Sequence, residues 1–524
     1  MAECKFESRS ELNAKVLRGV NILADNVATT LGPKGRNVIL HQKEKEPFIT
    51  KDGVTVSDFV YIDDEFENAA AQIIKQATSQ TNAMAGDGTT TATVLARGIL
   101  VKAQRYITAG ASPTELKRGI DRAVEYVVSR LHDTATHIET LADVENIATI
   151  SANNDRVIGK LIATAVDKAG KDGSITIEES KTVNTSLDLI EGFRVEAGYA
   201  ASAFVTDERR GAVYYETPLL LVTDAKIDAV DQILPALEIV SRDGRPLIII
   251  AEEIEGQALA ALIMNTVRGS IKIAAVKAPF YGDHRRNILS DLALTTGAEF
   301  FSRENTVSLR DIKLSHFGQC RSIDIIKNGT TVVGGKGDFK EVDRRIEILK
   351  QELGATDDMG ECEKIQERIT KLASGVAVIK VGAPTKVEMT EKKHRIEDAL
   401  EAVKSAQQEG IVCGGGVALI RAAPGLCKIT TENEDQQFGV DIVAAAIKEP
   451  LRQMAINCGL SPDLILNLVE TNAGNTGYNF RNNSIVDMLE DGIIDPVKVT
   501  RVALQNAASA AGTLITTSHA IVEI

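Results

Sequence analysis

The chain contains no tryptophan, and aromatic residues make up only 4% of its 524 positions. Its hydrophobic cores must therefore be built mainly from alanine, valine, isoleucine and leucine, which favours helix-rich packing with small side chains. The length alone predicts about three domains.

Cysteine is also scarce. The six cysteines lie far apart and form no C-x-x-C pair, which predicts a reduced, intracellular protein without a structural zinc site. No apolar segment reaches the roughly 18 residues that a membrane span requires, and the first residues lack the apolar core of a signal peptide. We therefore expect a cytoplasmic protein that does not act in a membrane.

Positive charge is in deficit. The chain has 59 lysines and arginines against 73 aspartates and glutamates, a formal net charge of −14. General binding to nucleic acid requires a basic surface, so this balance argues against a nucleic-acid partner.

One stretch, residues 86–93, combines residue types that suit a phosphate ligand. Gly86 and Gly88 flank Asp87, threonines occupy positions 89–91, and an apolar, helix-compatible segment follows. Amides at a helix start form an anion site, and a carboxylate beside it can hold a Mg²⁺ ion that bridges phosphates. The pattern differs from the P-loop motif. These residues alone are equally compatible with an ordinary Gly/Thr turn that caps a structural helix.

Both ends of the chain show helical periodicity, whereas the middle alternates short β-like and helical segments. Val54 to Val56 and the segment before residue 50 look like the strands of a hairpin with its tip at 50–53. Because both ends look alike and flank an α/β centre, we expect a discontinuous domain with a large insertion. Expected helices are 11–31, 64–85, 89–109, 113–132, 153–168, 230–240, 256–268, a pair within 341–371, and 386–405.

Two helices in the central part are unusually apolar. The segment 230–240 carries an apolar stripe, whereas 256–268 is apolar almost all the way round. Such a helix is normally buried, but an exposed apolar face that binds partners is the alternative. The sequence pattern leaves both possibilities open.

In the expected helix 386–405, Ile396, Leu400 and Val403 form the core stripe. Asp398 lies opposite that stripe, so periodicity alone predicts a solvated surface charge. A glycine triplet at 414–416 then opens another helix, which places a second glycine cluster at a helix start.

Taken together, these segments closely resemble the group I chaperonins, the GroEL type, over essentially the whole chain. Several family motifs occur at their expected spacings. The matching segments are residues 30–38, 50–54, 86–93, 272–279, 395–400, 414–419 and 495–496.

The resemblance implies a multidomain α and α/β fold with three domains. Residues 1–136 and 410–524 would form a mostly helical equatorial ATPase domain, 137–191 and 375–409 a small intermediate hinge domain, and 192–374 an α/β apical domain inserted in mid-chain. It further implies seven-subunit homo-oligomeric rings, a GroES-type co-chaperonin and ATP-driven encapsulation of non-native polypeptides for folding. The implied cofactors are ATP, Mg²⁺ and K⁺.

The resemblance also assigns roles to individual residues. Asp87 would bind Mg²⁺, Asp52 would position the attacking water, and Asp398 would act on water and metal when the domains close. A monovalent cation would lie near Thr30, Lys51 and Thr90. The nucleotide pocket would comprise Thr30, Leu31, Gly32, Pro33, Lys51, Gly53, Gly88, Thr89, Thr90, Thr91, Ile150, Gly415, Asn479 and Asp495.

In the insert, seven side chains match positions that bind non-native polypeptide and the co-chaperonin. The resemblance therefore favours an exposed apolar face over buried core for this region. These residues are Tyr199, Phe204, Leu234, Leu237, Leu259, Ile263 and Met264.

Several positions depart from the family's pattern, and the Gly/Met-rich C-terminal tail of many members is absent. Ala197 and Lys386 cannot form the usual inter-subunit ion pair, so cooperativity within the ring is expected to differ. Phe480 and Arg481 replace two small residues beside the base site. The other departures are Ala203 and Ser461.

Two other functions are compatible with parts of this pattern. A binding or scaffolding paralogue with impaired or altered ATP cycling is the alternative, although the complete set of Asp52, Asp87 and Asp398 argues against it. A small-molecule kinase ranks last, because nothing in the chain suggests an acceptor pocket.

Overall fold

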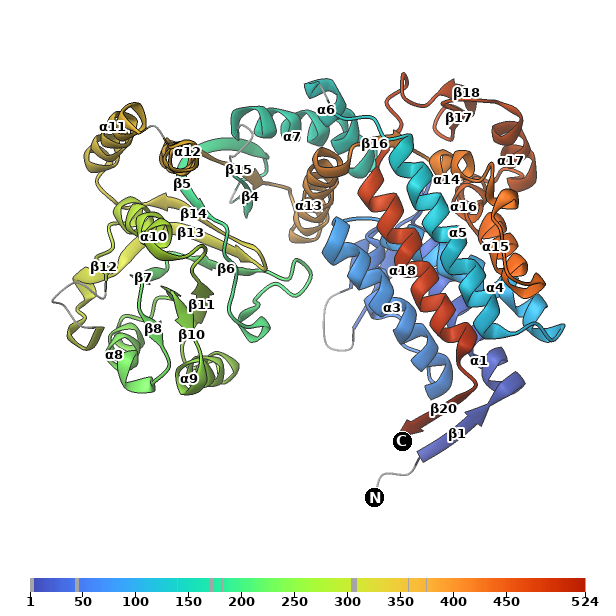
Figure 1. Ribbon diagram of the computed structural model, residues 1–524, viewed down its shortest axis with the longest axis horizontal. Helices are drawn as coiled ribbons and strands as arrows, with labels where there is room; N and C mark the ends of the chain where they lie inside the picture. Colours follow the sequence, from blue (N-terminus) through green and yellow to red (C-terminus); the bar gives the residue numbers. More distant parts are fainter. Residues whose placement is uncertain are drawn as a thin grey trace. The chain divides into compact units, whose positions relative to one another are not determined.

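The computed structural model describes residues 4–42, 47–138, 140–169, 174–180, 182–302, 309–356, 358–373 and 375–523. The chain folds into two compact units (Figure 1). The first comprises Met1–Ala163 and Ala383–Ile524, and the second Thr164–Gly382. The expected multidomain architecture with a central insertion is therefore confirmed. The expected intermediate domain is divided between the two units, and its boundaries stay a prediction.

The core of the first unit is a bundle of long helices. The helix α18 packs against α3, α4 and α5, and α15 packs against α5. Close approach depends on small residues: a Cβ atom at Gly119 on α5 would lie 2.0 Å from the carbonyl oxygen of Gln436 on α15. The helices are α1 (Arg9–Ala28), α3 (Glu65–Ala85), α4 (Thr89–Thr108), α5 (Pro113–Asp133), α15 (Glu434–Ala446) and α18 (Val497–Thr516).

The two ends of the chain meet in this unit. Strand β1 (Cys4–Ser8) pairs antiparallel with β20 (His519–Glu523). This pairing explains how segments from opposite ends of the sequence build one core. In the part of the chain that the structure describes, no helix is long and apolar enough to cross a membrane.

The expected hairpin with its tip at 50–53 is wrong in its second strand. Strand β3 (Phe48–Thr50) pairs instead with β2 (Val38–Leu40), and the segment after it forms helix α2 (Gly53–Phe59). The side chain of Asp52 accepts hydrogen bonds from the amides of Val54 and Thr55, so it caps this helix. An N-cap carboxylate of this kind overrides the β-propensity of the valines.

Further elements of the first unit surround its glycine-rich loops. Helix α6 (Leu141–Ser151), which the sequence pattern did not reveal, packs against α13 (Lys386–Glu409). Helix α7 (Arg156–Ala169) follows α6. The others are β16 (Ile411–Cys413), α14 (Val417–Ala422), α16 (Glu449–Asn457), α17 (Pro462–Thr471), β17 (Thr476–Asn479), β18 (Ser484–Asp487) and β19 (Ile494–Pro496).

The second unit is built on a mixed β-sheet. Its strand order is β11-β9-β7-β13-β14-β5-β15-β4, with β6 paired to β13 and β12 to β7. Strands β7, β9 and β11 run parallel. The strands are β4 (Ser174–Glu179), β5 (Ser186–Val195), β6 (Val213–Glu216), β7 (Leu219–Thr223), β9 (Leu247–Ala251), β11 (Ile273–Lys277), β12 (Phe300–Phe301), β13 (Gly318–Ile326), β14 (Gly329–Gly335) and β15 (Gly375–Val381).

Five of the described α-helices accompany this sheet. Helices α11 (Phe339–Ala355) and α12 (Met359–Ala373) pack against each other and against α10 (Gly282–Thr296), which confirms the expected helix pair. Helices α8 (Leu234–Asp243) and α9 (Gly256–Val267) are the two apolar helices of the sequence pattern.

Candidate functional site

The first unit contains a pocket with a volume of about 940 Å³. All residues that line it belong to this unit. The pocket brings together nearly all residues that the sequence predicted for a nucleotide site. Those in its lining are Thr30, Leu31, Gly32, Pro33, Lys51, Asp52, Gly53, Asp87, Gly88, Thr90, Thr91, Ile150, Asp398, Gly415, Asn479 and Asp495.

The turn from α3 to α4 presents Asp87 between two left-handed glycines. Gly86 has φ 72° and Gly88 φ 90°, a conformation that glycine adopts without a steric penalty. The N-cap of α4 is Gly88, which has no side chain to cap the first amides of the helix, and the first turn lines the pocket at Thr90 and Thr91. The turn therefore offers helix-start amides to an anion. Thr89 is buried and does not belong to the described lining.

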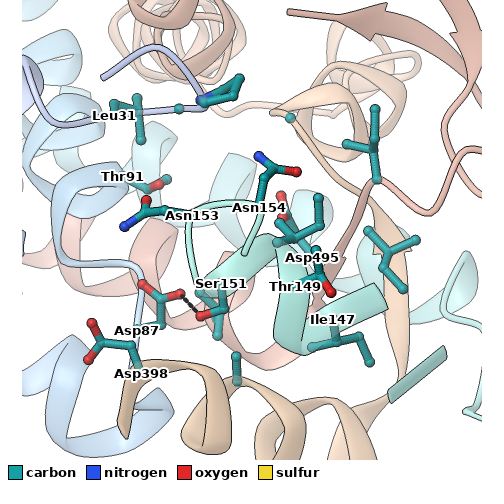
Figure 2. Close-up of a pocket in the computed structure, with 18 of the residues that line it drawn as sticks. Leu31, Asp87, Thr91, Ile147, Thr149, Ser151, Asn153, Asn154, Asp398 and Asp495 are labelled. Carbon is teal, nitrogen blue, oxygen red and sulfur yellow. Dashed lines mark hydrogen bonds between the residues drawn. The ribbon is translucent and has the colours of Figure 1, made fainter. Parts of the chain in front are cut away.

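Asp87 is held by neighbouring donors. The hydroxyl of Ser151 on α6 donates to its Oδ2 at 3.1 Å (Figure 2), and the amide of Gly88 donates to its Oδ1. Burial raises the pKa of Asp87, these two donors oppose the shift, and the nearby charge of Asp52 adds to it. The carboxylate therefore lies in a region short of positive charge, which suits a bound cation.

Asp87 and the pocket fit a hard cation that shares its ligands with a phosphate. Among the described residues, no group of three or more His, Cys, Asp or Glu side chains could hold a metal ion by itself. Mg²⁺ is usually bound through one or two carboxylates, with phosphate oxygens and waters completing its shell. The donor set around Asp87 agrees with that pattern.

Asp52 faces the same pocket from the start of α2. Its Oδ1 accepts from the amide of Val54 at 3.2 Å, and its Oδ2 accepts from the amide and hydroxyl of Thr55. These bonds fix the orientation of the carboxylate at the pocket. The next residue must be small, because a Cβ at Gly53 would lie 2.3 Å from the hydroxyl oxygen of Thr90.

Lys51 also lines the pocket. Its Nζ donates to the carbonyl of Gly32 at 3.1 Å and to Oδ1 of Asn153 at 3.2 Å. Burial lowers the pKa of Lys51, and the charge of Arg395 lowers it further, while Glu391 opposes the shift. The hydroxyl oxygens of Thr30 and Thr90, which also line the pocket, lie 3.2 Å apart.

The helix expected at 153–168 begins later than predicted. Asn153 and Asn154 both have positive φ, at 57° and 63°, and α7 starts at Arg156. The two asparagines instead form a loop that lines the pocket (Figure 2). Asparagine is among the few residues that tolerate this conformation, and the Asn-Asn pair was the signal that sequence reasoning missed, as it missed Ser151.

Helix α13 contributes one face to the pocket. The spacing of its lining residues places them on the side opposite the core stripe of Ile396, Leu400 and Val403, which is buried as predicted. Asp398 is half-buried and lines the pocket, so its interpretation as a solvated surface charge, drawn from periodicity alone, is wrong. The lining residues of α13 are Glu391, His394, Arg395, Asp398 and Ala402.

The far end of the pocket is formed around Asn479. Its Nδ2 donates to Oδ2 of Asp491 at 2.6 Å, and its Oδ1 accepts from the amides of Arg481 and Asn482 at 2.9 and 3.3 Å. The side chain therefore holds its own loop in place. Phe480, 3% exposed, lies next to it in the lining.

Asp495 lines this end as well. Burial raises its pKa to about 7, and the charge of Asp87 adds to the shift, while the amide of Gly415 opposes it. Two carboxylates, at 87 and 495, thus carry raised pKa values in one pocket. Such perturbed groups cluster at functional sites.

The predicted polypeptide-binding residues lie in the second unit and differ in exposure. Leu234 and Met264 are 47% and 51% exposed, whereas Tyr199, Leu259 and Ile263 are partly buried against the core. Two differ from the expectation of an exposed face, because they belong to the hydrophobic core. These are Phe204 and Leu237, at 0% and 7% exposure.

Comparisons with known proteins agree with this architecture. Among solved structures, the chain is similar to chaperonin gp146 from the bacteriophage EL 2 (Pseudomonas aeruginosa), crystallised in the presence of ATP-BeFx. The two share 20% sequence identity with a TM-score of 0.65, over 99% of each chain. At this identity the likeness shows the fold alone. The model of the TCP-1/cpn60 chaperonin family matches residues 23–524, and the chain therefore belongs to that family.

Proposed function

We propose that this chaperonin is a Mg²⁺-dependent ATPase that binds non-native polypeptides and encloses them for folding in a homo-oligomeric ring. One observation carries the proposal. The pocket of the first unit gathers Asp52, Asp87 and Asp398 beside the uncapped start of α4. Carboxylates, amide donors and a cation are what phosphoryl transfer to water requires.

The residues at the α4 end would hold the phosphates. The amides at the start of α4 and the hydroxyls of Thr90 and Thr91 would bind phosphate oxygens, and Asp87 would bind Mg²⁺. When bound, this ion neutralises charge on the phosphates. Thr30, Lys51 and Thr90 would adjoin K⁺ through their oxygen atoms and not through the Lys51 ammonium, which would repel the ion.

Asp52 and Asp398 would orient the attacking water. The carboxylate of Asp52 is anchored by the first amides of α2, so its orientation at the pocket is fixed. Asp398 lies on α13, which is far along the chain from Asp52, and lines the same pocket. Such positioning contributes through orientation and not through covalent chemistry.

The apolar helices of the second unit would bind the client. Leu234 on α8 and Met264 on α9 expose apolar surface, and unfolded chains share such surface. Seven subunits per ring, a GroES-type co-chaperonin and a cytoplasmic location are parts of the same proposal. They rest on the resemblance described above.

Replacement of Asp398 by alanine tests the proposed ATPase. We expect steady-state ATP turnover to fall at least a hundredfold, on the order of the loss on removing one catalytic group, while ADP affinity is retained. Glu388→Ala is the matched control, because Glu388 is an exposed carboxylate on the same helix outside the described pocket lining. Equal turnover in wild type and Asp398→Ala would refute the role of Asp398. A wild type that binds nucleotide without hydrolysing it would favour the scaffolding alternative.

A further inference from the structure

Helix α13 carries a second set of contacts, just beyond the pocket. Asp398, Glu401 and Ser405 are spaced three and four residues apart, so they lie along one face of the helix. Asp398 faces the pocket. Glu401 and Ser405 lie about one and two turns further along. Both of these residues contact the end of α3.

The hydroxyl of Ser405 donates to the carbonyl oxygen of Ala85 at 2.8 Å. Ser405 is 3% and Ala85 2% exposed, so water is excluded from this bond. Ala85 is the last residue of α3, where carbonyl groups lack a partner within the helix. Ser405 therefore supplies that partner from a different helix.

The second contact is made by the backbone of Gly86, which has no side chain to keep it away from α13. A Cβ atom at this position would lie 2.1 Å from the Cβ of Glu401 and 3.3 Å from its Cα. Such distances cannot be accommodated without moving α13 or the turn. The backbone of Gly86 is therefore packed directly against α13.

These two contacts join the segments that carry two of the acidic groups of the pocket, Asp87 and Asp398. Ala85 and Gly86 immediately precede Asp87, and Glu401 and Ser405 follow Asp398 on α13. We name the contacts of Ala85 and Gly86 with Glu401 and Ser405 the docking seam. Because α13 is stiff over two turns and Asp87 directly follows Gly86 in the chain, the docking seam limits how far the two carboxylates can separate.

We propose that Gly86 and Ser405 are positioning residues for ATP hydrolysis, because the docking seam holds Asp398 in register with Asp87. This inference rests on the proposed ATPase function. Neither residue is required to touch nucleotide for this role. Loss of the seam should therefore lower kcat and leave nucleotide affinity intact, since a misplacement of about 1 Å can cost on the order of a hundredfold in rate.

The first test replaces Gly86 with alanine. We expect kcat for ATP to fall about a hundredfold, with the Kd of a fluorescent ADP analogue within about threefold of wild type. The substitution causes a clash with Glu401 and also backbone strain, because Gly86 has φ 72°. These two effects must be separated. Gly110→Ala is the matched control: it imposes the same backbone strain at φ 98°, but no described atom lies within 4 Å of its added Cβ.

A compensating change distinguishes displacement from general damage. In Gly86→Ala with Glu401→Gly, the clashing Cβ of residue 401 is absent. We expect this double variant to recover at least about tenfold in kcat over Gly86→Ala, although glycine costs helix stability. A merely structural role would give the opposite order, because the double variant contains two destabilising changes.

Ser405→Ala probes the hydrogen bond alone. We expect a threefold to tenfold lower kcat, about the range that one net hydrogen bond supports, and an unchanged ADP affinity. Ser509→Ala, an exposed serine on α18, is the control and should behave as wild type. If Gly86→Ala and Ser405→Ala both retain wild-type kcat, the docking seam does not position Asp398 and the inference fails. If wild type itself shows no turnover, the proposed function fails instead.

Discussion

Asp495 offers a prediction whose size can be worked out from the structure. Burial raises its pKa from the ordinary 3.8 to about 7. The folded protein therefore retains a proton that the unfolded chain has released between pH 4 and 7. Stability contributed by this proton is fully present below pH 3.8 and is lost as the pH rises through 7.

The magnitude follows from the two pKa values. One pKa unit corresponds to about 1.4 kcal/mol, so the ionised side chain costs the fold roughly 4 kcal/mol at pH 8 and roughly 2 kcal/mol at pH 5. Asp495→Asn keeps the oxygen that accepts from Gly415 and removes the charge. We expect the variant to be more stable than wild type, with an advantage that grows by about 2 kcal/mol from pH 5 to pH 8.

Urea denaturation at the two pH values measures this advantage. The chain has no tryptophan, so unfolding is followed by far-ultraviolet circular dichroism, in Mg²⁺-free buffer without nucleotide. Asp491→Asn, which removes an exposed carboxylate at the same end of the pocket, serves as the control and should change the stability by a similar amount at both pH values. An Asp495→Asn advantage that is constant or shrinks between pH 5 and 8 would refute the assignment.

Three further predictions test other parts of the molecule. Asp52→Ala should lower the free energy of unfolding by about 1 kcal/mol through loss of the α2 cap and should lower ATP turnover; unchanged values of both would contradict its two roles. Leu234→Ser combined with Met264→Ser should weaken binding of an unfolded polypeptide about tenfold through lost apolar burial, without changing ATP turnover. Val157→Ser, at an exposed position, is its control. Equal binding by both variants would contradict the proposed role of Leu234 and Met264 in polypeptide binding. Phe480→Ala should cost about 3–5 kcal/mol in urea denaturation, as for other buried aromatic residues; a loss below 1 kcal/mol would contradict its packing.

Much of the first unit could be predicted because its helices have regular apolar periods and clear ends. The helix expected at 64–85 is observed at Glu65–Ala85, and it ends where Gly86 takes a left-handed conformation. Glycine and proline set these boundaries locally, so no tertiary information was needed. The pocket residues in the turn between α3 and α4 could be predicted from the same local signals.

The errors came from positions where tertiary structure decides. Val54 and Val56 favour a strand by composition, but the Asp52 cap starts a helix, and β2 takes the place of the expected partner strand. Asp398 looks like a surface charge on its own helix, and some residues that line its pocket, such as Asp87, lie more than three hundred positions away in the sequence.

The exposure of the apolar side chains could not be predicted from periodicity either. Leu234 and Leu237 occupy one apolar stripe, yet one is 47% and the other 7% exposed. Packing of neighbouring elements over part of the stripe makes this difference. A pattern of apolar residues identifies which face is apolar, and not how much of it is covered.

The central claim is that ATP hydrolysis in the pocket drives the folding of bound clients. The most direct measurement is the yield of a denatured test enzyme refolded with ATP and without nucleotide, by wild type and by Asp398→Ala. We predict that ATP raises the yield for wild type and leaves the variant at its nucleotide-free value. Equal yields with and without ATP for wild type, or equal gains for both proteins, would contradict the account.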